Sequence, residues 1–176
     1  MDKEHKIDLK KYIRAIPDWP KKGILFRDIT PLLGDAEAFK AAVDAMAADY
    51  MGKGIQYVAA AEARGFIFGA AVAVKLNAGY VPVRKKGKLP YKTEGITYEL
   101  EYGSNTMEVH KDAVPAGAKV LMVDDLLATG GTIEAACKLM ERIGGKIEGV
   151  VFLIELAELH GIDKLSKYKV KSLLRY

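Results

Sequence analysis

The chain has 176 residues, of which 50% are hydrophobic and 28% charged, and its formal net charge is +4. This composition is ordinary for a globular protein with one full core and lies far from that of disordered chains. The single cysteine, Cys137, excludes an intrachain disulfide. No apolar run approaches the length of a membrane span and the charged start lacks a signal-peptide core, so we expect a cytoplasmic protein.

In the first half of the chain, apolar patterns alternate between helix and strand. Residues 35–52 predict a helix with Asp35 as its N-cap, and residues 55–61 predict a short buried strand. A helix over 65–76 and a strand over 80–83 follow. The next segment, KKGKLPYKTEG over 85–95, is basic and interrupted by Gly and Pro, which predicts a surface loop.

In the second half, the stretches that begin at 96 and 106 predict an antiparallel pair of strands. A strand ending at Asp124-Asp125, a helix over 130–145, a strand over 146–156 and an edge strand over 169–174 complete the pattern. Cys137 falls inside the last predicted helix among apolar residues, which favours a buried, inert thiol. Apolar strands joined by helices predict an α/β fold with a mostly parallel central sheet and helices on both faces.

The stretch VLMVDDLLATGGT, residues 120–132, combines a strand end, an acidic pair and a small-residue turn. Ligands bind beyond the carboxyl ends of parallel strands, and a helix N-terminus attracts anions. The turn therefore suits a phosphate, while Asp124 and Asp125 suit the hydroxyls of a sugar or a metal ion. Taken singly, Asp125 could be a helix cap and the Gly-Gly pair a plain connection. Together these features favour a sugar-phosphate site, and neither a P-loop nor a GxGxxG motif is present.

The same stretch resembles the phosphoribosyl-diphosphate signature of the type I phosphoribosyltransferase family. IPDWPKKGILFRDITPLL at 16–33, EARGFIFG at 62–69 and RKKGKLP with YELEYG within 84–103 narrow the resemblance to members that act on adenine. The resemblance implies the type I phosphoribosyltransferase fold as a single domain over 1–176. Within it, about 1–34 would form an N-terminal hood that contributes to the adenine site, and about 85–105 a flexible catalytic loop.

The resemblance also implies transfer of 5-phosphoribosyl from phosphoribosyl diphosphate to N9 of adenine, which gives AMP and diphosphate in purine salvage. The transition state would be oxocarbenium-like, with positive charge on the ribose. By position, Asp124 and Asp125 contact the ribose hydroxyls. The residues implied to bind the 5′-phosphate are Ala128, Thr129, Gly130, Gly131 and Thr132.

Further roles fall on charged residues near predicted strand ends. Arg64, Arg84 and Lys88 would contact the pyrophosphate, and Arg64 and Glu101 are the implied catalytic residues. From the residues alone, Arg64 could be a solvated arginine, RKKGK a solvated charge run, and Glu101 an exposed strand glutamate. The resemblance favours Glu101 as the group that moves the proton, because related hypoxanthine-guanine enzymes have an acid at the position of Ala128 and alanine cannot move a proton.

Adenine recognition is implied for the GILFRD segment. Phe26 would stack on the purine, while the backbone of Leu25 and Arg27 would read its edge and reject a 6-oxo group. The alternative is that Leu25 and Phe26 are simply core residues.

The implied cofactor is Mg²⁺ carried by the substrate, with no direct metal ligand from the protein. The expected partners are adenine, phosphoribosyl diphosphate and a second copy of the chain in a homodimer, with no nucleic acid and no membrane. Two other hypotheses remain. One is an enzyme of the same fold for another purine such as xanthine, and the other is a DNA-binding regulator that senses phosphoribosyl diphosphate. The segment before the purine motif is short for a DNA-binding domain, which disfavours the regulator.

Overall fold

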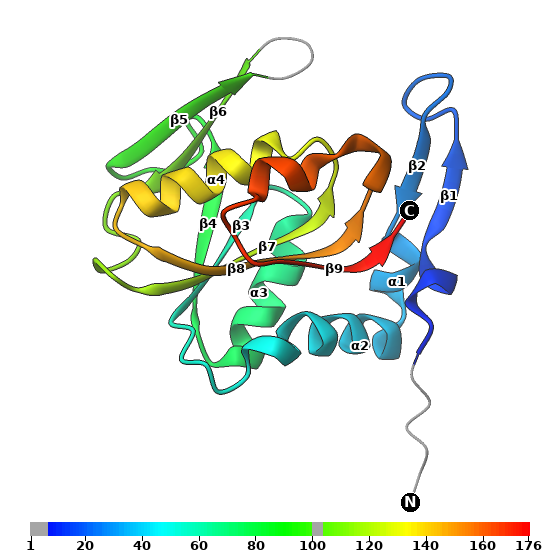
Figure 1. Ribbon diagram of the computed structural model, residues 1–176, viewed down its shortest axis with the longest axis horizontal. Helices are drawn as coiled ribbons and strands as arrows, with labels where there is room; N and C mark the ends of the chain where they lie inside the picture. The colour runs from blue at the N-terminus through cyan, green and yellow to red at the C-terminus, as the bar shows by residue number, and fades with distance from the viewer. Residues whose placement is uncertain (1–6, 100–103) are drawn as a thin grey trace, which may run out of the picture.

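The computed structural model describes residues 7–99 and 104–176, and within them seven strands form one sheet in the order β5-β6-β4-β3-β7-β8-β9 (Figure 1). The strands β4, β3, β7, β8 and β9 run parallel, and β5 and β6 are antiparallel additions beside β4. The sheet confirms the predicted α/β fold with a mostly parallel central sheet. Its strands are β3 (Tyr57–Ala61), β4 (Gly79–Lys85), β5 (Thr93–Glu99), β6 (Ser104–His110), β7 (Lys119–Leu127), β8 (Lys146–Glu155) and β9 (Val170–Arg175).

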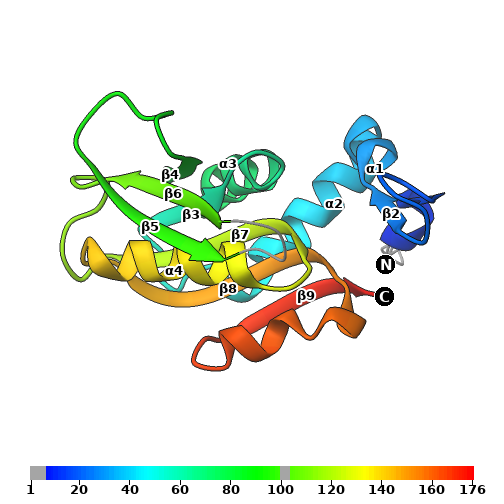
Figure 2. The same cartoon turned by 90° about the horizontal axis from the view of Figure 1, so that it is seen from above.

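Helices cover both faces of the sheet (Figure 2). The helices α2 (Ala36–Ala47) and α3 (Gly65–Leu76) lie on one face, and α4 (Gly131–Arg142) lies on the other. Successive strand residues point to opposite faces. Accordingly, Leu121 belongs to the core cluster under α2 and α3, and Met122 belongs to the cluster under α4. Short 3-10 helices flank these elements: η1 (Leu9–Tyr12), η2 (Ala48–Tyr50), η3 (Ala157–Leu159) and η4 (Gly161–Leu165).

A separate antiparallel hairpin stands beside the C-terminal end of the chain (Figure 1). It pairs β1 (Arg14–Pro17) with β2 (Leu25–Asp28) and leads into the short helix α1 (Thr30–Gly34). Residues of both strands are mostly exposed or half-buried, so they lack the apolar alternation that predicts a strand. The hairpin reaches the main sheet through Arg27, whose guanidinium lies 3.9 Å from the ring centroid of Tyr176.

Most predicted elements are confirmed, with two differences. The Asp35 carboxylate accepts a hydrogen bond from the Ala38 backbone N at 2.9 Å, so Asp35 caps α2 as expected. The loop predicted over 85–95 is too long, because Thr93 already pairs with His110 and begins β5. Also, β7 does not end at the acidic pair. Its pairing with β3 stops at Val123, while its pairing with β8 continues to Leu127.

Candidate active site

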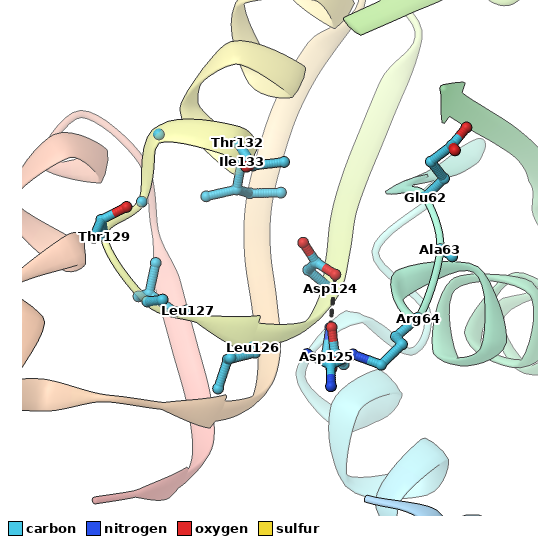
Figure 3. Close-up of a pocket in the computed structure, with 13 residues that line it drawn as sticks. Glu62, Ala63, Arg64, Asp124, Asp125, Leu126, Leu127, Thr129, Thr132 and Ile133 are labelled. Atoms are coloured by element: carbon cyan, nitrogen blue, oxygen red, sulfur yellow. Dashed lines mark hydrogen bonds and ion pairs between the residues drawn. The ribbon is translucent and has the colours of Figure 1, made fainter. Parts of the chain in front are cut away.

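The order of the strands reverses between β3 and β7. From β3 the chain proceeds first to β4 on one side and later to β7 on the other. Parallel sheets bind ligands beyond the carboxyl ends of their strands at such a switch point. A cavity of about 240 Å³ opens there, and Figure 3 shows its walls. It is lined by Glu62, Ala63 and Arg64 after β3, Asp124 to Leu127 of β7, and Ala128 to Ile133 of the following turn and α4.

The turn of residues 128–132 forms the end of the cavity at the N-terminus of α4. Gly130 adopts φ +80°, a left-handed conformation that favours glycine. The turn is held from behind by Gly161, since a Cβ on Gly161 would collide with the Ala128 carbonyl oxygen and one on Gly130 with the Gly161 carbonyl oxygen. The unpaired N–H groups of the first helical turn and the Thr129 and Thr132 hydroxyls can all donate to an anion.

Asp124 and Asp125 lie on β7 at the floor of the cavity (Figure 3). The Asp125 backbone N donates a 2.9 Å hydrogen bond to Asp124 Oδ1. Burial, followed by the neighbouring Asp125 charge, raises the pKa of Asp124 well above its ordinary value. The carboxylate fits only because Gly65 has no side chain, as a Cβ there would lie 2.5 Å from Asp124 Oδ1.

Arg64 bridges the acidic pair and the N-terminal hairpin. Its Nε lies 2.8 Å from Asp125 Oδ2, and its guanidinium carbon lies 5.3 Å from the centroid of the Phe26 ring. Burial raises the pKa of Asp125, while the Arg64 charge acts in the opposite direction. Arg64 is therefore not simply a solvated arginine, because its side chain contacts both Asp125 and the Phe26 ring.

The rim of the cavity carries charged side chains, and two hydrogen bonds of the rim meet at the Glu62 carboxylate. The Glu62–Ala63 peptide bond is cis. Glu62 Oε2 accepts hydrogen bonds from Arg84 Nε and from the Lys85 backbone N, both at 3.0 Å. Arg84 Nη1 also donates to the Lys88 carbonyl at 3.1 Å. This network ties Arg84 to Glu62, which lines the cavity, and Arg84 in turn contacts the backbone of Lys88. The role of the RKKGK run toward a diphosphate stays a prediction.

Phe26 and its neighbours form an aromatic surface on the hairpin. The Phe26 ring packs edge-on against Trp19 at a centroid distance of 4.4 Å. Leu25 is 47% exposed and Trp19 is 52% exposed, and Phe26 is only half-buried. The alternative that Leu25 and Phe26 are core residues is therefore wrong. An exposed aromatic surface joined to the cavity by Arg64 can accept a flat heterocycle.

The structure thus brings together most of the candidate residues from four separate segments of sequence. Glu101 lies outside the described residues. Sequence reasoning missed Glu62, Gly65 and Gly161, whose importance comes from contacts between segments that no local pattern reveals. It also missed Tyr98 of β5, whose hydroxyl lies 3.2 Å from Thr132 Oγ1. The available signal for Tyr98 was its place in a strand of alternating pattern, where it points to the face opposite that of the exposed Thr97.

The donor groups of the cavity are compatible with a divalent cation that is held mainly by a ligand. In residues 7–99 and 104–176, no cluster of three or more His, Cys, Asp or Glu side chains could hold a metal ion. A cation that arrives on diphosphate oxygens would need no direct ligand from the protein. Across the same residues, no helix is long and apolar enough to cross a membrane.

The fold and this cavity define a phosphoribosyltransferase. Consistent with that class, residues 32–174 match the phosphoribosyl transferase domain family. Two curated relatives, the adenine phosphoribosyltransferases of Thermotoga maritima and Rhodopirellula baltica, are each 54% identical to the chain. Both alignments cover 97% of this chain, with 99% of the Thermotoga protein and 82% of the Rhodopirellula protein. The chain belongs to the adenine phosphoribosyltransferase family.

Solved structures agree with this assignment. The adenine phosphoribosyltransferase of Thermoanaerobacter pseudethanolicus superposes with a TM-score of 0.92 at 52% identity, covering 96% of this chain and 98% of that one. The Saccharomyces cerevisiae enzyme, solved with D-2,5-dideoxy-2,5-imino-altritol 1,6-bisphosphate and adenine, gives a TM-score of 0.90 at 40% identity. That comparison covers 94% of this chain and 96% of the yeast chain.

Proposed function

We propose that the chain transfers 5-phosphoribosyl from phosphoribosyl diphosphate to N9 of adenine, giving AMP and diphosphate. The observation that carries this proposal is the single cavity at the β3–β7 switch point. It combines a phosphate-binding turn, two carboxylates and a basic rim, and the aromatic hairpin surface adjoins it through Arg64. The turn suits the 5′-phosphate and the carboxylates suit the ribose hydroxyls. The basic rim suits a diphosphate, and the aromatic surface suits a purine.

The 5′-phosphate occupies the turn of residues 128–132, where backbone N–H groups and the hydroxyls of Thr129 and Thr132 donate to it. The acidic pair precedes this turn on β7 and lines the same cavity, which supports a ribose bound over Asp124 and Asp125. There the carboxylates accept hydrogen bonds from the 2′- and 3′-hydroxyls. When the glycosidic bond breaks, positive charge develops on the ribose ring, and a nearby fixed carboxylate stabilises it.

The diphosphate lies at the rim, near Arg64, Arg84 and Lys88. Arg84 is held by Glu62 in the free protein, so it exchanges a carboxylate for a diphosphate oxygen when the donor binds. Mg²⁺ bound to the diphosphate would neutralise charge on the leaving group, carried by the substrate and without a direct ligand from the protein. The protein's own part is to orient the leaving group and keep it away from water.

Adenine stacks on Phe26, beside Trp19, with the backbone of Leu25 and Arg27 at its edge. A backbone carbonyl accepts from the 6-amino group but would face another acceptor in a 6-oxopurine, which explains the preference physically. Glu101, on the segment between β5 and β6, is proposed to exchange a proton with the base.

The same proposal includes a homodimer in the cytoplasm. The surface of α3 supports the homodimer. Ile67 and Val74, spaced along one side of this helix, are 39% and 83% exposed. Helical spacing places Ala70 between them, so the outer stripe of α3 is apolar. An exposed apolar stripe of this kind is typical of a protein interface.

The direct test is product formation from phosphoribosyl diphosphate and Mg²⁺ with adenine, hypoxanthine, guanine and xanthine in parallel. We expect AMP from adenine alone, with activity lost in a chelator and restored by added Mg²⁺. Turnover of a 6-oxopurine instead would overturn the role of Leu25 to Arg27. Binding of the donor without any turnover would favour the regulator hypothesis, which DNA-binding measurements would then test.

A further inference from the structure

Strand β5 lies along α4 (Figure 2). One of its side chains reaches the phosphate-binding turn. The Tyr98 hydroxyl lies 3.2 Å from Thr132 Oγ1, and Tyr98 and Thr132 are 34 positions apart in sequence. Thr132 stands in the first turn of α4 and lines the part of the cavity that the 5′-phosphate would fill. Tyr98 is therefore in contact with the phosphate-binding turn without lining the cavity itself.

We propose that Tyr98 is a positioning residue that orients the Thr132 hydroxyl toward the 5′-phosphate; this inference rests on the proposed function. A threonine hydroxyl has one proton and can accept as well as donate. When an anion occupies the turn, the favoured arrangement has Tyr98 donating to Thr132 and Thr132 donating to the phosphate. Hydrogen bonds in such a chain polarise and strengthen one another.

The contact does not serve merely to attach β5 to α4, because other contacts already do so. Arg142, in the last turn of α4, donates to the Gly95 carbonyl at 3.3 Å. Ile96 packs against the core cluster under α4. Removing the Tyr98 hydroxyl while keeping its ring should therefore leave the strand in place and change only the orientation of Thr132.

The test uses Tyr98→Phe in the full chain and measures binding by calorimetry. Ribose 5-phosphate carries the 5′-phosphate but no diphosphate. Pyrophosphate is the diphosphate group alone and lacks the 5′-phosphate. We expect the affinity for ribose 5-phosphate to fall about three- to tenfold, the value of one hydrogen bond, with pyrophosphate affinity unchanged. In steady-state kinetics, the KM for phosphoribosyl diphosphate should rise by a similar factor, and the KM for adenine should not change.

Thr97→Val is the matched control. Thr97 is the neighbouring residue on β5, and its hydroxyl pairs with Thr106 Oγ1 at 2.9 Å instead of with the turn. This variant also loses a hydroxyl from β5 but should keep the affinity for ribose 5-phosphate. An equal loss in both variants would assign the effect to the strand and overturn the proposal.

A double-mutant cycle with Thr132→Val tests whether Tyr98 acts through Thr132. In the Thr132→Val background, Tyr98→Phe should have no further effect on ribose 5-phosphate affinity. A full additive loss there would overturn the inference, as would an unchanged affinity in the single Tyr98→Phe variant. If the wild-type chain bound neither ribose 5-phosphate nor phosphoribosyl diphosphate, the proposed function itself would fail, which is a distinguishable outcome.

Discussion

Arg64 holds the buried carboxylate of Asp125 through a 2.8 Å contact from its Nε, and the same guanidinium faces the Phe26 ring. One side chain thus joins the floor of the cavity, proposed for the ribose, to the aromatic surface proposed for the base. Because the two substrates would meet on either side of it, a change at Arg64 should affect both. A shared residue of this kind couples binding sites that lie on separate elements of the fold.

Arg64→Gln should lower kcat/KM for both substrates by at least about tenfold, the effect of losing one charged hydrogen bond. Arg64 opposes the burial that raises the pKa of Asp125, so its removal should raise that pKa further. If catalysis needs ionised Asp125, the acidic limb of the kcat/KM profile should move to higher pH. Arg175→Gln is the control, since Arg175 also pairs with a buried carboxylate, Glu155, outside the cavity lining. An unchanged acidic limb in Arg64→Gln would contradict the role given to Asp125.

Gly65→Ala should weaken binding of phosphoribosyl diphosphate by at least about tenfold while the protein stays folded. The new Cβ would lie 2.5 Å from Asp124 Oδ1, so the carboxylate has to turn away from the ribose site. Alanine is a better helix former than glycine, by up to about 1 kcal/mol, which limits any loss of stability. Gly34→Ala is the matched control, as Gly34 has nothing within 4 Å of its would-be Cβ. Calorimetric titration and thermal melting of both variants would decide; wild-type affinity in Gly65→Ala would disprove the proposed place of Asp124.

Asp124→Asn should abolish most activity yet raise the melting temperature of the free protein at neutral pH. The pKa of Asp124 is raised in the folded state by burial, so the folded state binds this proton more tightly than the unfolded state. Stability linked to this group is therefore greatest at low pH and is lost as pH rises from about 4 through the raised pKa. We expect a rise of about 2 °C or more at pH 7.5, which corresponds to ~1 kcal/mol in a chain of this size.

The advantage of Asp124→Asn over the wild type should shrink as the pH is lowered toward 5. Melting curves across that range provide the measurement. A constant difference at every pH would mean that the charge of Asp124 is not what destabilises the folded state.

Tyr176→Leu should raise the KM for adenine about two- to fivefold and leave the KM for phosphoribosyl diphosphate unchanged. The Tyr176 ring lies 3.9 Å from the Arg27 guanidinium, and this contact fixes the hairpin that carries Phe26. A cation over an aromatic ring contributes about 0.5–1 kcal/mol at an exposed site. Tyr176→Phe keeps the ring and should behave as the wild type. Steady-state kinetics would refute the idea if both variants lost adenine affinity equally.

The sequence was informative wherever the chemistry is local. The strand, turn and helix around residues 120–142 form one continuous motif, so the presence of the turn and of the acidic pair at one site could be predicted. Their roles toward phosphate and ribose stay predictions. The β1–β2 hairpin could not be predicted from its pattern, because Arg14–Pro17 and Leu25–Asp28 are mostly exposed and show no periodicity. The type I resemblance assigned this segment to the adenine site, and that role stays a prediction.

Contacts between distant segments were beyond prediction. Gly65 makes room for Asp124, and Gly161 packs closely against the turn of residues 128–132, but each glycine alone is consistent with any helix start or turn. The end of β7 was placed at Asp125 because the apolar run stops there. In the structure, β8 is longer than β3 and continues to pair with β7 as far as Leu127.

The buried thiol of Cys137 makes the protein suitable for site-directed labelling. Cys137 is the sole cysteine of the sequence, is 0% exposed, and burial raises its pKa to about 12. A maleimide or disulfide reagent should therefore leave the native protein unmodified and react only after unfolding, which a thiol titration in and out of denaturant would verify. A cysteine introduced at exposed Thr97 would then be the one reactive thiol, and a fluorophore there could report on β5 as each substrate binds.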